Sequence, residues 1–167
     1  MPVSVRIASS ADGDAVVKVI KAVYDEYDFP WYPDGYHKDL YDLDAYYRDH
    51  GDIFYLAELD GQPVGTAALE HFSEVPEGDD RRVAGADCSV ERLYVVPEAR
   101  RAGVGSALMQ KVIVDARNGG RKRMEVWTDK RFEAAHKLYE RLGAKVVAER
   151  LCDDPEKSPE WGMALDL

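Results

Sequence analysis

The sequence predicts an α/β protein whose strands form one mixed sheet in a single domain. Within its 167 residues, short segments of alternating apolar and polar side chains recur along the chain. Longer segments with apolar residues at helical spacing separate them, and glycine, proline and aspartate mark the boundaries. No internal repeat, linker or low-complexity segment divides the chain. We therefore expect one domain over residues 1–167.

The N-terminal part is predicted to form a strand followed by two helices. Residues 3–8 alternate apolar and polar side chains, and Ser9 then offers an N-cap for a helix with an apolar stripe from Ala15 to Val23. This helix ends in an aromatic, proline-containing segment. A shorter helix over about residues 38–48 is expected to follow.

The strongest local signal is a β-hairpin. Two apolar-rich segments, residues 53–59 and 63–72, flank Asp60-Gly61, a pair that favours the tight turn between antiparallel strands. A polar loop follows, and the next strand ends at Pro97. The remaining elements are expected to be a helix over 105–117, a strand over 121–128, a helix over 132–142 and strands over 144–151 and 161–167.

Charge is distributed unevenly along the chain. The net charge is -10, yet residues 1–60 contain 13 acidic and 5 basic side chains, whereas residues 92–150 contain 7 acidic and 14 basic ones. The acidic part disfavours general nucleic-acid binding and suits a cationic partner, while the basic part suits a compact polyanion. Charge alone is equally consistent with two solvated surfaces.

Two further features bear on location. The chain has no apolar segment near the roughly 20 residues that span a bilayer, and its N-terminal segment lacks the features of a signal peptide. Cys88 and Cys152 lie far apart without metal-ligand spacing. We therefore expect a cytoplasmic protein with free thiols, no metal site and no membrane partner.

The turn after Pro97 carries the clearest chemical signal. Gly103 and Gly105 allow backbone amides to approach an anion, and the helix that begins there directs its unpaired N–H groups and positive dipole end to the same point. Arg100 and Arg101 add cations, and Ser106 adds a hydroxyl. The segment matches neither the dinucleotide fingerprint nor the P-loop. It predicts a phosphate site of another kind, although glycines in such a turn can also be purely steric.

These residues resemble the GNAT superfamily of acyl-CoA-dependent N-acetyltransferases. The family signature Arg/Gln-x-x-Gly-x-Gly/Ala is matched by Arg100, Gly103 and Gly105. Its second signature, an alanine-rich turn leading into Leu-Tyr-x-x-x-Gly, is matched by Ala134, Ala135, Leu138, Tyr139 and Gly143. The resemblance implies a mostly antiparallel central sheet with a splayed parallel strand pair, flanked by about four helices.

The resemblance also implies acetyl-CoA, or a close acyl-CoA, as cosubstrate. The turn would hold its pyrophosphate through the residues Arg100, Arg101, Ala102, Gly103, Val104, Gly105 and Ser106. The backbone of Leu93, Tyr94 and Val95 would pair with the pantetheine like an added strand. A splayed strand has free N–H and C=O groups that need such partners.

Acetyl transfer requires a proton to leave the amine and another to reach the departing thiolate. Tyr139 resembles the family's general acid, and a reference pKa of about 10 keeps its hydroxyl protonated at neutral pH. Glu91 resembles the base that several members use through water, and its alternative role is to pair across strands with Arg92 or with another nearby arginine. Glu70 and His71 are further candidate bases.

In the family, the segment after the first strand normally lines the acceptor site, and we expect the same of the segment over residues 24–47. It is both acidic and aromatic, and its predicted substrate-binding residues are Tyr24, Glu26, Phe29, Trp31 and Tyr32. We therefore expect direct transfer, in a ternary complex, to a small-molecule or peptide amine that is cationic or aromatic, catalysed by a monomer or homodimer. The alternative is a non-catalytic acyl-CoA sensor.

Overall fold

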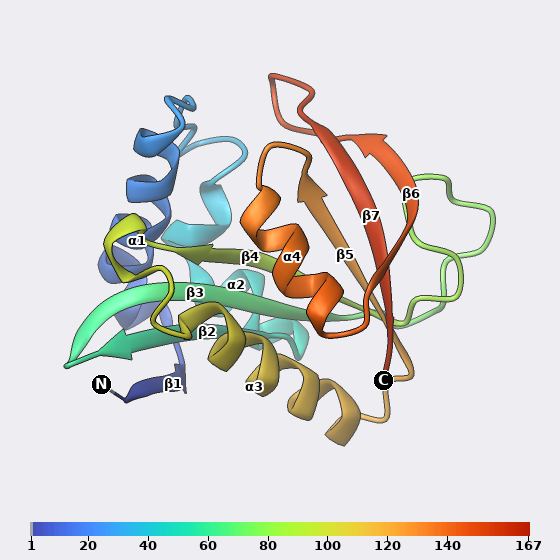
Figure 1. Ribbon diagram of the computed structural model, residues 1–167, viewed down its shortest axis with the longest axis horizontal. Helices are drawn as coiled ribbons and strands as arrows, with labels where there is room; N and C mark the ends of the chain where they lie inside the picture. Colours follow the sequence, from blue (N-terminus) through green and yellow to red (C-terminus); the bar gives the residue numbers. More distant parts are fainter. Residues whose placement is uncertain (1) are drawn as a thin grey trace. The chain divides into compact units, whose positions relative to one another are not determined.

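The computed structural model describes residues 2–167 (Figure 1). Seven strands are hydrogen-bonded in the order β1-β2-β3-β4-β5-β7-β6. Their bounds are β1 Val3–Ile7, β2 Ile53–Leu59, β3 Gln62–His71, β4 Cys88–Val95, β5 Arg123–Asp129, β6 Lys145–Leu151 and β7 Pro159–Asp166. The helices are α1 Gly13–Glu26, α2 Leu43–Tyr46, α3 Val104–Asn118 and α4 Glu133–Arg141.

The strand pairing confirms the predicted mixed sheet. The pairs β1–β2, β2–β3, β5–β7 and β6–β7 are antiparallel, whereas β4 and β5 run parallel through Cys88, Ser89 and Val90 of β4. The contacts divide the chain into two compact units. The first contains the residues up to Leu69 together with Arg92–Val112, and the second contains Glu70–Glu91 and Ile113–Leu167.

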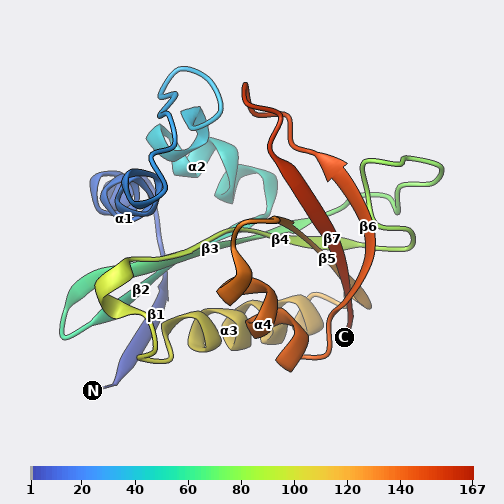
Figure 2. The ribbon, with the colours of Figure 1, turned by 45° about the horizontal axis from the view of Figure 1, so that its top comes forward.

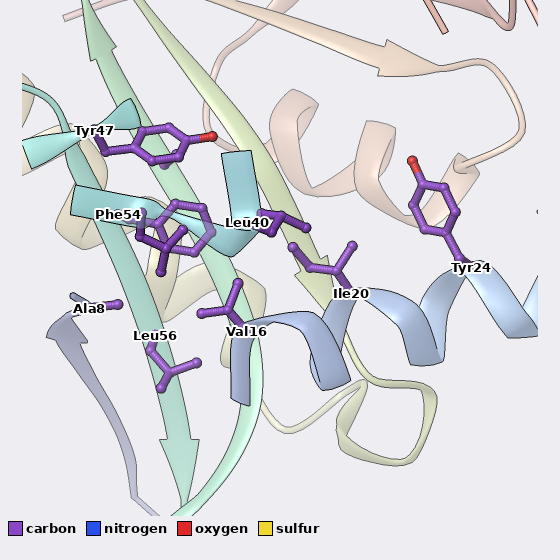
Figure 3. Packing of buried hydrophobic residues seen from close by; sticks show 10 residues of the cluster. Ala8, Val16, Ile20, Tyr24, Leu40, Tyr47, Phe54 and Leu56 are labelled. Carbon is purple, nitrogen blue, oxygen red and sulfur yellow. The ribbon is translucent and has the colours of Figure 1, made fainter. Parts of the chain in front are cut away.

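In the first unit, helices cover both faces of the β1–β2–β3 strands. The helices α1 and α2 lie over one face, and the N-terminal half of α3 lies over the other (Figure 2). Val16 and Ile20 of α1 are fully buried in a core with Leu40, Phe54 and Leu56 (Figure 3). The predicted apolar stripe of α1 thus forms the packing face of the helix.

The predicted hairpin is confirmed, and its turn explains why. Asp60 and Gly61 have φ values of 53° and 75°, the left-handed conformation that a two-residue hairpin turn requires at both positions. The turn places Leu59 opposite Gln62. It thereby fixes the register of the strands that carry Gly65 and Thr66.

The short helix predicted over about residues 38–48 is wrong as a single element. The structure has a 3₁₀ turn at Lys38–Tyr41, the four-residue α2 and a second 3₁₀ turn at Arg48–His50. Asp42 separates the first two because its backbone is not helical (φ -154°, ψ 68°) and its carboxylate accepts a hydrogen bond from the N–H of Ala45. An aspartate in this role caps a new helix rather than continuing the old one.

In the second unit, an ion pair between Arg82 and a fully buried carboxylate connects a long loop to the sheet. Arg82 donates to Glu125 of β5 over 3.0 Å, and the carboxylate of Glu125 also accepts the N–H of Val83. Glu125 is fully buried. Burial raises the pKa of Glu125 above its ordinary value, although the bond and charge of Arg82 oppose this shift.

Two expectations from the sequence bear on the chain as a whole. Cys88 and Cys152 are free and buried, as expected. Among residues 2–167, no helix combines the length and the apolar character needed to cross a bilayer.

Candidate active site

The turn between β4 and α3 lies in the first unit and has the backbone shape of an anion cradle. Arg101 and Gly103 have positive φ values of 68° and 81°. α3 begins at Val104, and its first helical bond runs from the N–H of Ala107 to the carbonyl of Gly103 over 3.0 Å. The amides of the first turn therefore have no acceptor within the helix. Residues 101–103 are exposed, so this helix end is open to a phosphate.

Gly65 of β3 lets this helix approach the strands closely. A Cβ atom at Gly65 would lie 2.7 Å from Cγ1 of Val104, 3.0 Å from Cδ1 of Leu108 and 3.2 Å from the carbonyl oxygen of Tyr94. No side chain fits into that space without displacing its neighbours. Gly65 therefore helps to position the cradle, a role that the sequence analysis missed.

The second half of β4 is distorted beside β3. Arg92 has a φ of 53°, and its carbonyl accepts a hydrogen bond of 2.8 Å from the hydroxyl of Thr66. Beyond this point the N–H of Val96 donates to the carbonyl of Val64 over 3.0 Å. A residue with positive φ interrupts the pleat of a strand, as at a β-bulge. The predicted pantetheine-binding residues Leu93, Tyr94 and Val95 follow Arg92 directly and are half-buried.

Arg100 and Glu26, which the sequence assigned to two different ligands, pair with each other. A guanidinium nitrogen of Arg100 lies 2.6 Å from a carboxylate oxygen of Glu26 at the end of α1. Both side chains are about one-third exposed (34% and 32%). The pair neutralises one cation at the cradle and one acid of the predicted acceptor segment.

The predicted aromatic residues of the acceptor segment gather around His37. The Trp31 ring stacks on His37 at a centroid distance of 3.9 Å, and Tyr24 meets His37 edge-on at 4.5 Å. Tyr24 also contacts Phe29 at 5.6 Å and Tyr94 at 6.0 Å. Burial, followed by the neighbouring Tyr94 and Tyr36, raises the pKa of Tyr24, so its phenol stays neutral.

The predicted Tyr32 reaches the same cluster through its backbone. Its N–H donates to Nδ1 of His37 over 3.1 Å, and the two rings lie parallel with centroids 6.5 Å apart. His37 is fully buried. It was not singled out in the sequence, because a lone histidine in a polar segment carries no signal of burial.

A buried arginine joins this cluster to β4. Two guanidinium nitrogens of Arg92 donate to the two carboxylate oxygens of Asp39, over 3.2 and 2.7 Å, and one of them also donates to the carbonyl of Tyr36 over 2.7 Å. The Tyr36 ring lies over the guanidinium, with its centroid 4.8 Å from Cζ. The hydroxyl of Tyr47 donates to Asp39 as well. The side chain of Arg92 is only 10% exposed.

The second unit holds Glu91, the candidate base, in a group of charged side chains. Burial lowers the pKa of Arg82, but the bond and charge of Glu125 outweigh this effect, and Glu70 and Glu91 raise that pKa further. Glu91 is half-buried and accepts a long hydrogen bond of 3.5 Å from the hydroxyl of Ser89. Three carboxylates thus act on one guanidinium, which was not singled out in the sequence.

Tyr139, the candidate acid, lies on α4 in the same unit. Its side chain is 4% exposed, and the neighbouring Leu138 is 8% exposed. One face of α4 is thus buried, as the spacing of its apolar residues predicts. His136, one turn earlier, contacts the carbonyl of Asp129 through Nε2 at 2.9 Å.

The structure therefore brings many predicted residues together within one unit. The first unit contains the cradle, the pantetheine-binding part of β4 and the aromatic acceptor segment, and it adds Gly65, His37 and Arg92. A strand that leads through a glycine turn to an exposed helix N-terminus is an arrangement that can bind a phosphate group.

Comparison with known proteins identifies the family. Residues 20–144 match the family model described as "Acetyltransferase (GNAT) family". The chain belongs to this family.

Curated relatives cover different shares of the chain. The N-acetylaspartate synthetase of Danio rerio is 34% identical over 114 residues, which are 68% of this chain and 37% of that protein. The aminoalkylphosphonate N-acetyltransferase of Salmonella typhimurium is 28% identical over 153 residues, 87% of each chain. The chain spans less than half the length of three of the relatives it matches, the synthetase among them, with 37–46% of each protein covered.

Solved structures share the fold at low identity. A GNAT acetyltransferase from Staphylococcus aureus has a TM-score of 0.79 at 18% identity, over 99% of both chains. yncA of Salmonella typhimurium, which was solved with its cofactor acetyl-CoA, has a TM-score of 0.70 at 20% identity, over 99% of this chain and 94% of that one.

Proposed function

We propose that this protein is an N-acetyltransferase that moves the acetyl group of acetyl-CoA directly to a primary amine, as a single domain over residues 1–167. The observation that carries the proposal is the cradle between β4 and α3 in a chain of the GNAT family. The positive φ values of Arg101 and Gly103 and the exposed start of α3 fit a pyrophosphate. The solved relative that contains acetyl-CoA adds support for this cosubstrate.

In this proposal, groups of the chain itself hold the cosubstrate. The first-turn amides of Val104, Gly105 and Ser106 and the hydroxyl of Ser106 would bind the pyrophosphate, and Arg101 would add charge at the rim. The backbone of Leu93–Val95 would pair with the pantetheine amides. Bound acetyl-CoA supplies the activated thioester, and the protein orients it.

Two proton transfers accompany the reaction. Glu91, directly or through water, would accept the proton that the attacking amine loses as its nitrogen bonds to the acetyl carbon. Tyr139 would deliver a proton to the sulfur as the carbon–sulfur bond breaks. The products are the acetylated amine and CoA with a free thiol, so the reaction consumes no other reactant.

The acceptor is proposed to be a small molecule with an apolar or aromatic part, because Tyr24, Phe29 and Trp31 form one aromatic cluster. The cationic acceptor expected from the sequence has less support, since Glu26 is paired with Arg100 and Asp39 with Arg92. Two relatives are named for aspartate and for aminoalkylphosphonates. Both of these acceptors carry an amine and an acidic group.

The setting of the reaction is part of the proposal. Two free, buried cysteines support a reducing compartment such as the cytoplasm. A monomer or homodimer without a nucleic-acid or membrane partner is the proposed state.

Mass spectrometry of the reaction products tests the function. The purified protein is incubated with acetyl-CoA and a pool of polyamines, aromatic amines, amino acids, aminophosphonates, aminoglycosides and basic peptides. An acetylated product supports the enzyme and identifies its acceptor class. Saturable binding of acetyl-CoA without any product supports instead the alternative, a non-catalytic acyl-CoA sensor.

A further inference from the structure

We propose that Arg92 recognises a carboxylate or phosphonate group on the acceptor amine. This inference rests on the proposed function and specifies its substrate class. It begins from the bonding of the guanidinium. Nε and Nη2 of Arg92 are bound to Asp39 and to the carbonyl of Tyr36, whereas Nη1 is buried and has no hydrogen-bond partner within residues 2–167.

An unsatisfied donor of this kind needs an explanation. Buried polar groups are nearly always hydrogen-bonded, because leaving a donor unpaired away from water costs free energy. Nη1 carries two N–H groups that can donate to the oxygens of a carboxylate or phosphonate, and the guanidinium supplies the opposite charge. Asp39 holds the opposite edge of the guanidinium in place, so its orientation is set before a ligand arrives.

The surroundings of Arg92 favour an anion over a second cation. The Asp39 carboxylate is already bound by Arg92 and Tyr47, and Glu26 is paired with Arg100. Lys21 lies over the Trp31 ring at 6.0 Å and adds a positive charge to the aromatic cluster.

The remaining acids of this segment do not change that balance. Asp25, Asp28, Asp34 and Asp42 are exposed, and exposed charges are screened by water and salt. Asp44 is already paired with Arg48. A second ammonium group on the acceptor would therefore find no buried acid that lacks a cation in the described part of this segment.

The location of Arg92 suits recognition of an acceptor. It occupies the position of positive φ in β4, directly after Glu91 and directly before the predicted pantetheine-binding residues. The Tyr36 ring lies over the guanidinium and is partly buried.

The test uses pairs of amines that differ only in the acidic group. L-phenylalanine is compared with L-phenylalaninamide, and 2-aminoethylphosphonate with its diethyl ester. For each pair the ratio of kcat/KM is measured for the wild-type protein and for Arg92→Gln. Because the two members of a pair differ in amine basicity, the change in the ratio between proteins is the informative quantity.

The ratio is the kcat/KM of the acidic amine divided by that of its amide or ester. We expect Arg92→Gln to lower this ratio by roughly 10-fold or more for at least one pair, since a charged hydrogen bond is lost. The KM for acetyl-CoA should change by less than about twofold, because the lost contact is to the acceptor alone. A general loss of structure would instead weaken the binding of both substrates. Arg150→Gln is the matched control. Arg150 is half-buried, pairs with Glu160, donates to the carbonyl of Arg81 and lies against an aromatic ring, that of Trp127.

An unchanged ratio in folded Arg92→Gln, or an equal fall in Arg150→Gln, would overturn the inference. If Arg92→Gln does not fold, inhibition of the wild-type protein decides. 3-Phenylpropanoate should compete with the amine at a concentration at which 3-phenylpropanamide does not, and equal inhibition by the two contradicts the role of Arg92. Absence of any acetylated product from the wild-type protein contradicts the proposed function itself.

Discussion

A methyl group at Gly65 would lie 2.7 Å from Cγ1 of Val104. The first turn of α3 therefore packs directly against the backbone of β3 at this glycine. The same methyl group would lie 3.2 Å from the carbonyl oxygen of Tyr94. Gly65 thus sets the spacing between the helix that begins the cradle and the strand that is proposed to bind the pantetheine.

Gly65→Ala should weaken both the fold and the binding of acetyl-CoA. Overpacking of this kind costs about 1–3 kcal/mol, and a displaced α3 should raise the KM for acetyl-CoA several-fold. Urea unfolding and initial rates measure the two effects. Gly13→Ala is the control, because a Cβ there would lie 3.6 Å from the nearest atom, the carbonyl oxygen of Leu40. Equal behaviour of the two variants would refute the proposed role of Gly65.

Tyr139→Phe should lower kcat by about 10²-fold or more, in the range typical of a lost general acid. The KM for acetyl-CoA should stay nearly constant, because the change removes a single oxygen. Steady-state kinetics measure both quantities, and Tyr46→Phe, at a tyrosine that is 42% exposed, is the control. An unaltered kcat in Tyr139→Phe removes this residue from the mechanism.

Glu91→Gln should lower kcat/KM for the amine most strongly at neutral pH. The deficit should shrink as the pH rises, because a growing fraction of the amine is then already neutral and needs no base. Rates from pH 6.5 to 9.5 measure this dependence. Glu70→Gln, at another candidate base that also acts on Arg82, should give a nearly normal profile if Glu91 is the base. A deficit that is constant with pH would contradict the role of Glu91 as base.

The stability of the wild-type protein relative to Glu125→Gln should depend on pH. Burial raises the pKa of Glu125 in the folded state, so the charged carboxylate carries a cost above the folded pKa that is relieved as the pH falls below it. The wild-type protein should therefore gain stability relative to the variant as the pH falls from 7 to about 4.3. Thermal unfolding at several pH values measures this difference, and a wild-type protein that loses stability relative to the variant on acidification would show that the sign is wrong.

The fold was largely predictable because its signals are local. The hairpin turn depends on Asp60 and Gly61, two adjacent residues, and the core face of α1 depends on apolar residues one turn apart. The exception is the segment 38–48, where Asp42 caps a new helix instead of continuing one. The spacing of apolar residues alone does not reveal such a cap.

The site was predictable only where its residues are close in sequence. The cradle residues 100–106 lie in one turn, whereas Arg92 and Asp39 are 53 positions apart, and Arg82 and Glu125 are 43 positions apart. Charge counts predicted an acidic segment and a basic one. They did not predict that Glu26 and Asp39 of the acidic segment bind arginines of the basic segment. Because these acids are already paired, the expected acceptor changes from a cationic amine to an amine with an acidic group.

The most direct test of the account is calorimetric titration of acetyl-CoA into the wild-type protein and into Gly105→Val. The account predicts saturable binding, with one acetyl-CoA per chain, to the wild-type protein and its loss in the variant, because a branched side chain would stand between the first-turn amides and the pyrophosphate. The variant must show the unfolding transition of the wild-type protein for the comparison to count. Absence of binding to the wild-type protein, or equal affinity in a folded variant, would contradict the claim that the turn between β4 and α3 holds acetyl-CoA.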